Sequence, residues 1–260
     1  MEGKLDLVFG LRNNRTIIKD VYYQPPLKAS RGLYVTNPHD VTVYLMESSG
    51  GLVAGDTNRY AMQLEAGTHV TLHPQAATKV YPAFNGHPST QQVQVTLEEA
   101  ASLIWKREEV IPFAESSFRS HTRVDMKDNS SFYWEEILYP GREKRGETFT
   151  FDNCHTMLEV WVEDDCVVYD GLRFEPVKQT LKHIGVMGHY HYIASIWMID
   201  QAKELDPEKW NYTENDHQVS TTRLRNAGYL VRFLSNDLPR TKNEMEAIYQ
   251  SIFTKQEENL

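Results

Sequence analysis

The sequence predicts a mainly β protein, with strands stacked in two layers like a β-solenoid and an amphipathic helix at the C-terminal end. Three observations predict this class. Runs of period two, rich in β-branched and aromatic residues, fit pleated, half-buried strands. One pattern repeats about every 30 residues, and only one segment shows a clear helical period. The strand candidates are residues 5–9, 16–23, 41–46, 70–72, 92–97, 132–134, 158–162, 167–169, 192–199 and 229–234. Turn-forming residues at 13–14, 66–67, 163–165 and 226–228 separate several of these runs.

The repeat consists of a strand, a short polar turn and a second strand. Leu64, Leu97 and Met126 occupy the same position in successive units, at spacings of 33 and 29 residues. Six residues later come Val70, Leu103 and Phe132, and eight residues later come Leu72, Trp105 and Trp134. Repeats of this length are typical of stacked β units, although a meander of hairpins would show a similar recurrence of apolar residues.

A local signal competes with this register at residues 96–101. Thr96-Leu-Glu-Glu matches a capping box, and the following pair of alanines favours helix. The repeat instead predicts a turn followed by a strand. Because tertiary context overrides propensity, we expect the turn and the strand.

The helical segment is residues 241–253. Thr241 and Glu244 form a capping box, and an apolar face follows at helical spacing. The face consists of Met245, Ile248, Tyr249, Ile252 and Phe253. Such a helix can close a core or dock a partner. Residues 201–220 are polar and contain Pro207, which predicts a loop with one helical turn. Without a linker, residues 1–260 are expected to form one domain.

Composition excludes several classes of protein. The chain has 27 Lys and Arg against 36 Asp and Glu, a net charge of −9, which argues against binding nucleic acid through its phosphates. The 40% hydrophobic content excludes a disordered chain. There is no secretory signal pattern, no apolar run long enough for a membrane span, and only two cysteines. We therefore expect a cytoplasmic protein that binds neither nucleic acid nor membrane.

Two segments suggest a site near the start of the chain. Residues 48–56 hold three glycines before Asp56, without the Lys-Ser/Thr ending of a phosphate loop. They form either a tight corner or a place where another group approaches the backbone closely. Residues 75–81 contain Lys79, which could pair with a carboxylate such as Asp56 or simply lie exposed at a strand end.

Further candidates lie in the second half of the chain. If Trp134 faces the core, alternation turns Glu136 inward, where it needs a partner such as Arg142 or Arg145. His189 and His191 would lie on one face of a strand, and imidazole suits nickel, zinc or copper. Since no third and fourth ligand follow at diagnostic spacing, they form either an open metal site or a polar surface pair.

Taken together, six motifs resemble the family of urease accessory proteins called UreD or UreH. They are Ser-Gly-Gly-Leu-Val-Ala-Gly-Asp at 49–56, Gln-Ala-Ala-Thr-Lys-Val-Tyr at 75–81, Ile-Pro-Phe at 111–113, Glu-Ile-Leu at 136–138, Pro-Gly-Arg at 140–142 and Arg-Gly-Glu at 145–147. The likeness extends over essentially the whole chain, to Tyr-Leu-Val-Arg-Phe at 229–233 and the last helix.

The resemblance implies a non-enzymatic chaperone that supports nickel insertion and metallocentre assembly in urease. Its implied partners are urease apoprotein, UreF and, through UreF, the GTPase UreG. No cofactor would be bound tightly, but Ni²⁺ could pass transiently along an internal route. Candidates for that route are Asp56, Glu136, His189 and His191. Lys79, Arg142, Arg145 and the apolar helix residues would serve structure or partner contact, with the helix docking UreF. The alternatives are a β-rich metal-dependent enzyme using His189 and His191, or a passive β-solenoid interaction module.

Overall fold

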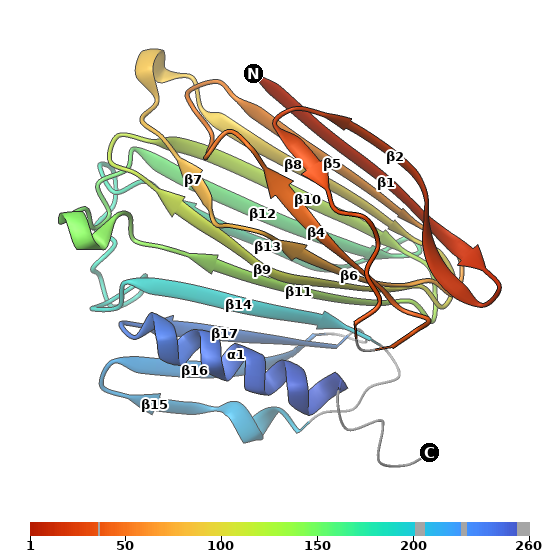
Figure 1. Ribbon diagram of the computed structural model, residues 1–260. Coiled ribbons are helices and arrows are strands. Elements are labelled where there is room, and N and C mark those ends of the chain that lie inside the picture. Colours follow the sequence, from red (N-terminus) through yellow and green to blue (C-terminus); the bar gives the residue numbers. More distant parts are fainter. Residues whose placement is uncertain (36, 201–205, 225–227, 254–260) are drawn as a thin grey trace.

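Two β-sheets lie face to face in the structure, a computed structural model that describes residues 1–35, 37–200, 206–224 and 228–253 (Figure 1). The seven-stranded sheet has the order β13 (Asp165–Phe174), β12 (Asn153–Val162), β10 (Ser117–Met126), β8 (Ser89–Leu97), β5 (Thr57–Leu64), β1 (Glu2–Arg12) and β2 (Arg15–Gln24). The ten-stranded sheet has the order β15 (Tyr212–Glu214), β16 (His217–Leu224), β17 (Gly228–Ser235), β14 (Tyr192–Ile199), β11 (Ser131–Leu138), β9 (Ser102–Pro112), β6 (His69–Pro74), β4 (Val41–Glu47) and β3 (Leu27–Ala29), and β7 (Thr78–Val80) also pairs with β9.

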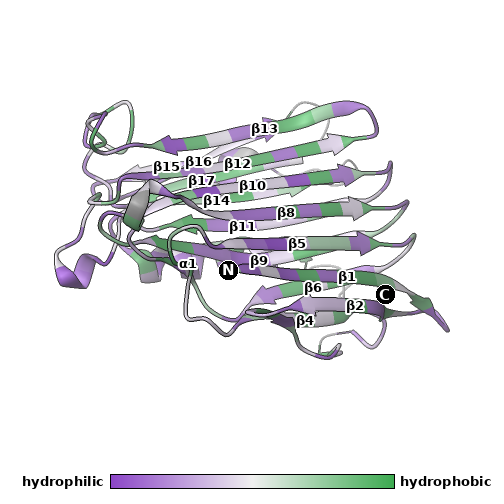
Figure 2. Ribbon diagram, turned by 90° about the horizontal axis from the view of Figure 1, so that it is seen from above, coloured by the Kyte–Doolittle hydropathy of each residue, from purple (hydrophilic) through white to green (hydrophobic). Residues whose placement is uncertain are grey.

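The chain alternates between the two sheets through the middle of the molecule, from β4 to β12. Neighbouring strands are parallel from β1 through β5, β8 and β10 to β12, and from β4 through β6 and β9 to β11. Antiparallel pairs occur at the margins, as in β1–β2, β12–β13 and β11–β14. This parallel stacking confirms the β-solenoid-like prediction and rules out a simple meander for the repeated units. The alternation of hydropathy along the strands is visible in Figure 2.

The register of the strands matches the sequence repeat residue by residue. Leu64 pairs with Leu97, and Leu97 pairs with Met126. In the other sheet, Trp105 lies between Leu72 and Trp134. The turn expected after Thr96 is also present, and β9 begins at Ser102, so the capping-box signal there is overridden.

Apolar side chains form two clusters between the sheets. The larger cluster lies toward the turns of the repeat and includes Leu97 and Trp134, and the smaller one at the opposite end includes Phe118 and Val110. A third cluster lies outside the ten-stranded sheet, beneath α1 (Leu238–Phe253), which contacts β14 and β17 and lies in front of β17 in Figure 1.

Helix α1 differs from its prediction in where it begins, and its apolar face lies where the core alternative placed it. It begins three residues before Thr241, because the Asp237 carboxylate accepts the backbone N–H of Arg240 at 3.0 Å and caps the first turn. Met245, Ile248 and Ile252 are buried against the sheet, while Tyr249 and Phe253 are partly buried there. This face therefore closes a core, one of the two roles that the sequence left open, and docking of UreF by the helix and its surroundings stays a prediction.

Two loop predictions also need correction or comment. Within residues 206–220, the expected helical turn is the 3₁₀ helix η3 (Pro207–Trp210), but the strands β15 and β16 were missed because their sequence is polar. The remaining 3₁₀ helices are η1 (Phe84–Gly86) and η2 (Glu143–Arg145). Residues 201–205 and most of the predicted turn at 226–228 lie outside the described residues. Over the described ranges, no helix is long and apolar enough to cross a membrane.

Candidate functional site

A belt of polar residues crosses the interior between the two apolar clusters of the sandwich. We call it the polar belt. In the seven-stranded sheet its members are register partners on β5, β8, β10 and β12: Asn58, Gln91, Ser120 and Thr156. In the ten-stranded sheet they are register partners on β9, β11, β14 and β17: Glu108, Glu136, Ser195 and Arg232. Neighbouring strands lie about 4.8 Å apart, so the belt places Glu108 beside Glu136 in an interior that is otherwise apolar.

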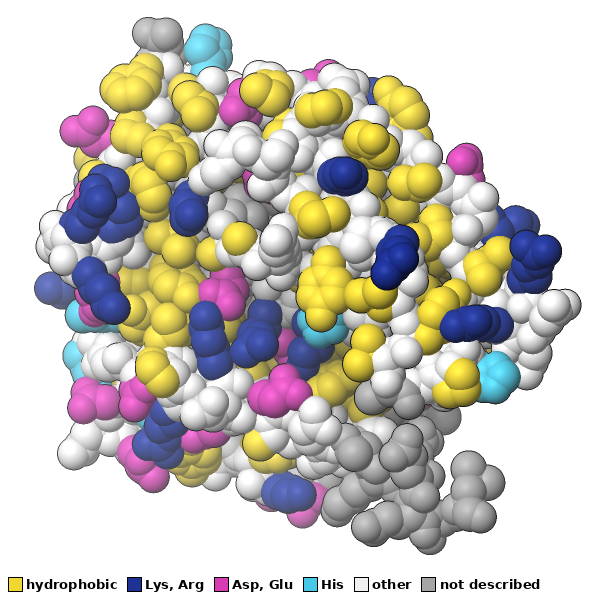
Figure 3. Space-filling view, viewed as in Figure 1, with side chains coloured by type: hydrophobic (Ala, Val, Ile, Leu, Met, Phe, Trp, Pro, Cys, Tyr) yellow, Lys and Arg dark blue, Asp and Glu magenta, His cyan; other side chains and the backbone are white. Residues whose placement is uncertain are grey.

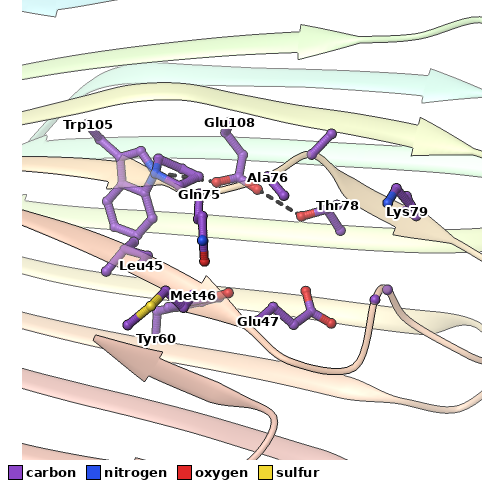
Figure 4. A pocket seen from close by; sticks show the side chains of 14 residues that line it. Leu45, Met46, Glu47, Tyr60, Gln75, Ala76, Thr78, Lys79, Trp105 and Glu108 are labelled. Carbon is purple, nitrogen blue, oxygen red and sulfur yellow. Dashed lines mark hydrogen bonds between the residues drawn. The ribbon is translucent and has the colours of Figure 1, made fainter. Parts of the chain in front are cut away.

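Glu108 lies at the centre of a hydrogen-bond cluster (Figure 4). Its carboxylate accepts bonds from the Thr78 hydroxyl at 3.2 Å, the Gln91 amide at 3.3 Å and the Trp105 indole N–H at 3.3 Å. Burial raises the pKa of Glu108 to about 7, although these donors act in the opposite direction. Since its side chain has no cation within ion-pair distance among the described residues, Glu108 is a buried acid without a counterion.

Glu136 faces inward together with Trp134, as alternation predicts. Its pKa is raised to about 7, mainly by burial and also by the neighbouring Glu108, while Arg232 acts in the opposite direction. The Thr156 hydroxyl donates to Glu136 across the sandwich at 3.3 Å. Glu108 and Glu136 therefore form a coupled acidic pair, which we call the acidic pair.

The predicted partners of Glu136 are wrong. Arg142 forms a salt bridge with Glu147, and its guanidinium stacks on the Phe113 ring with 4.1 Å between them. Arg145 lies in η2, in a loop that leaves the ten-stranded sheet. Both arginines follow β11 in the sequence, but the chain turns out of the sandwich at Pro140, so neither side chain returns to the interior.

A cavity of about 60 Å³ leads from the surface to Glu108, enough space for a few water molecules. Its walls include parts of two sequence motifs: the glycine-containing segment around Gly50 and Gly51, and residues 74–79. Gly51 has a φ of +139°, and a Cβ at this position would lie 2.5 Å from the Lys79 carbonyl oxygen. The close approach, one of the two alternatives for this loop, therefore occurs, and it joins the loop to β7 through Leu52 and Lys79.

The opposite end of the polar belt is closed by an ion pair. Arg232 on β17 contacts Asp170 on β13, across the gap between the two sheets. The Trp197 indole also donates to Asp170, at 3.2 Å. The Arg232 and Asp170 side chains are 27% and 21% exposed. This ion pair therefore separates the acidic pair from solvent without being fully buried.

Three buried polar atoms of the belt have no hydrogen-bond partner within the described part of the chain: Asn58 Nδ2, Gln91 Oε1 and Arg232 Nε. Gln91 is only 2% exposed, and its amide nitrogen already bonds Glu108. An unpaired buried carbonyl oxygen is costly, so Gln91 Oε1 is available to accept a hydrogen bond or to coordinate a cation.

Asp56 and Lys79 do not pair with each other in the described part of the chain. The Asp56 carboxylate accepts the backbone N–H of Val53 at 3.0 Å and the N-terminal ammonium of Met1 at 2.5 Å. It therefore stabilises the corner, the alternative that the sequence left open. Lys79 is exposed on β7 and lines the cavity.

His189 and His191 do not converge, and the strand placement predicted for them is wrong. They precede β14, in a turn and the residues after it. His189 Nε2 bonds the Asn215 carbonyl oxygen at 2.6 Å, and His191 Nδ1 bonds the Glu143 carboxylate at 2.6 Å. Among the described residues, no group of three or more His, Cys, Asp or Glu side chains is arranged to hold a metal ion.

Sequence reasoning missed Glu108, which the structure places beside Glu136. It also missed Lys106 and Glu135, a buried ion pair with 2.7 Å between its charged atoms. An available signal was the run of charged residues Lys-Arg-Glu-Glu inside an otherwise apolar strand at 106–109. On the outer face of the sheet, Lys106, Arg107 and Lys242 line a shallow pocket with His73, and Figure 3 shows basic side chains gathered near the middle of this face.

Comparison with known proteins gives a consistent result along the chain. A family profile described as "UreD urease accessory protein" matches residues 1–258. The chain is 39% identical to the urease accessory protein UreD of Sporosarcina pasteurii, over 93% of this chain and 96% of that protein. It is similar to the UreD proteins of Lysinibacillus sphaericus, at 35% identity over 96% and 95% of the two chains, and of Halalkalibacterium halodurans, at 34% over 98% and 94%.

Proposed function

Since the chain belongs to the UreD family of urease accessory proteins and so acts in urease maturation, we propose that it is a scaffold and metallochaperone through which Ni²⁺ passes on its way to urease. The observation that carries this proposal is the acidic pair inside the sandwich. Two adjacent carboxylates without a buried counterion destabilise a fold, so their position calls for a function. Passing a divalent cation through the interior is such a function.

The chemistry of the belt suits a cation in transit. Carboxylate and amide oxygens are weaker ligands for nickel than imidazole or thiolate, so the ion can exchange from one group to the next. Glu108, Glu136 and the unpaired oxygen of Gln91 supply such oxygens. Cys154, which would bind nickel tightly as a thiolate, is buried near Glu136, and burial raises the pKa of its thiol well above the usual range. The thiol thus stays protonated and does not trap the ion.

The direction of the route follows from the geometry of the cavity. An ion entering past Glu47 and Lys79 meets Glu108 first, then Glu136 on the next strand. Asp170 and Arg232 lie two strands farther along the belt, and opening their ion pair would release the ion at the far edge. Asp56 is outside this proposed route, because both of its carboxylate oxygens stabilise the corner.

The proposed partners are urease apoprotein, UreF and, through UreF, UreG, with all of them meeting in the cytoplasm. The buried face of α1 does not serve this purpose, as Met245 and Ile248 are part of the core. Docking surfaces are therefore sought on the exposed side of α1 and on the loops that contain Val53 and Phe84, which are 49% and 67% exposed.

The test is reconstituted activation of urease apoprotein with UreF, UreG, GTP, bicarbonate and nickel. The double variant Glu108→Gln/Glu136→Gln keeps the side-chain shapes but removes both charges. We expect normal complex formation and a large loss of nickel in urease. The matched control is Glu98→Gln/Glu99→Gln, an exposed acidic pair in the turn after β8.

Each outcome distinguishes the candidate functions. Normal activation by the acidic-pair variant, at equal complex formation, would refute the internal route and favour a passive interaction module. Loss of activation together with loss of complex would point to a structural role for the pair. A metal-dependent enzyme using His189 and His191 would show activity of its own without urease, and the separate partners of these residues do not favour that alternative.

A further inference from the structure

The strand β9 contains a β-bulge directly before Glu108. Trp105 pairs with Trp134, and Glu108 pairs with Glu136, so three steps along β9 correspond to two along β11. Lys106 and Arg107 therefore share the single position opposite Glu135. In a regular strand, residues three apart point to opposite faces. The extra residue instead turns both Trp105 and Glu108 into the interior, and bulges commonly re-aim side chains in this way.

The bulge adopts an unusual backbone conformation that requires support. Arg107 has a φ of +37°, in the left-handed region that non-glycine residues avoid. Such a conformation persists only when its surroundings fix it. The surroundings here are supplied by one side chain, the carboxylate of Glu135, which has no exposed surface.

Glu135 uses both of its carboxylate oxygens to hold the bulge. Oε2 accepts the backbone N–H of Arg107 at 3.1 Å, and Oε1 accepts the Lys106 ammonium at 2.7 Å. The Tyr133 hydroxyl donates to Oε1 as well, at 2.7 Å. Lys106 is itself 5% exposed and lies 3.6 Å from the centre of the Tyr249 ring on α1. Both residues of the bulge are thus bound to the same carboxylate.

We propose that Lys106 and Glu135 are positioning residues, which hold the bulge in place and so keep Glu108 directed into the cavity. The pair lies on the opposite face of the sheet from Glu108 and acts on it only through the backbone of residues 106–107. The role of Glu108 toward nickel rests on the proposed function. The way in which Glu108 is oriented does not depend on it.

The orientation of Glu108 can be observed without nickel or urease. The Trp105 indole N–H bonds Glu108, and the chain has five tryptophans, so the indole signals of ¹⁵N-tryptophan-labelled protein report on this contact. Trp105→Phe assigns the signal, and Glu108→Ala gives its position when the bond is absent.

Two double variants distinguish positioning from bulk packing. Lys106→Met/Glu135→Leu removes the acceptor for the Arg107 N–H but fills the space with apolar groups, which replaces the buried ion pair. Glu246, which also pairs with Lys106 at 3.2 Å, is 41% exposed and keeps its bond from the Gln250 amide. Lys106→Met/Glu135→Gln keeps a carbonyl oxygen for that N–H. We expect the Trp105 signal of the Leu variant to move to its position in Glu108→Ala, and the Gln variant to retain the native signal.

The chain offers a close control. Glu163 binds the Lys127 ammonium at 2.9 Å and the backbone N–H of Asp128 at 3.3 Å, in a turn far from Trp105. Lys127→Met/Glu163→Leu should leave the Trp105 signal in place. Arg107→Gly should also keep it, because glycine adopts the left-handed conformation of the bulge without strain.

The outcomes separate this proposal from the proposed function. A native Trp105 signal in the folded Leu variant would overturn positioning, whatever the activation yield. A moved signal, with activation reduced to the level of Glu108→Ala, would support both proposals. A moved signal with normal activation would support positioning and refute the nickel role of Glu108.

A second variant keeps the proposal testable if the Leu variant does not fold. Lys106→Met/Arg107→Gly/Glu135→Gln retains a carbonyl oxygen for the backbone N–H of residue 107, leaves no buried ammonium opposite a neutral amide and relieves the strain of the bulge, so it should preserve the orientation of Glu108. A native Trp105 signal in this variant would support positioning. A moved signal would overturn it.

Discussion

Replacing Glu108 with Gln should stabilise the protein, and the gain should depend on pH. Burial raises the pKa of Glu108 from 4.5 to about 7, so the folded state binds this proton more tightly than the unfolded state does. Stability is therefore lost as pH rises from about 4.5 to 7, and the loss is complete above that range. The shift corresponds to about 3 kcal/mol in the free energy of unfolding at pH 8.

The Glu108→Gln side chain can be accommodated in the same hydrogen-bond cluster. The new amide oxygen can accept from the Trp105 indole, and the new amide nitrogen can donate to the currently unpaired Oε1 of Gln91. We thus expect most of the calculated gain to be realised. For a chain of this size, about 3 kcal/mol corresponds to a rise of roughly 6–12 °C in Tm.

The assay is urea denaturation of both proteins at pH 5 and pH 8. We expect Glu108→Gln to gain stability at pH 8 and little at pH 5. Glu47→Gln, at the more open mouth of the same cavity, is the control and should show little gain at either pH. An equal change at both pH values would refute the reasoning, since it would show that ionisation of Glu108 does not oppose folding.

Three other contacts give further predictions. Met245→Ala should lower the free energy of unfolding by about 2–5 kcal/mol, because it opens a cavity beneath α1, whereas Ala at the exposed Asn243 should have little effect in the same denaturation assay. Asp56→Ala should lower the free energy of unfolding by about 1–2 kcal/mol, because the carboxylate bonds to Val53 and Met1 are lost. Urease activation should fall only as far as the folded fraction does, and a larger fall would place Asp56 on the nickel route. Ellman's reagent should modify only Cys166 in the native protein and both cysteines in urea, and rapid labelling of native Cys154 would contradict its burial.

Much of the fold could be predicted because large apolar residues recur at equivalent positions of the repeat. Trp105 and Trp134 occupy equivalent positions in adjacent coils, and their spacing determines which strands pair. The inward orientation of Glu136 followed from the same alternation. Its partners could not be predicted, because Arg142 is close in sequence but the chain leaves the sandwich before reaching it.

The features that were missed depend on interactions that the periodicity of apolar residues does not reveal. Glu108 was missed because the bulge at Arg107 shifts the phase of the strand, so counting by twos from Trp105 places Glu108 outside. The start of α1 was misplaced because Asp237, rather than Thr241, caps the helix. β16 was missed because few of its residues are apolar, and its buried residues beneath α1 include the polar His217, which bonds Ser235 at 2.7 Å.

The measurement that tests the central claim most directly is nickel anomalous diffraction from crystals soaked in nickel chloride at pH 8. The internal route predicts an anomalous peak between Glu108 and Glu136, close to Gln91 Oε1, and predicts that the peak is absent from Glu108→Gln/Glu136→Gln. Nickel bound only at surface histidines such as His189 and His191, with an empty interior in the native protein, would contradict the route.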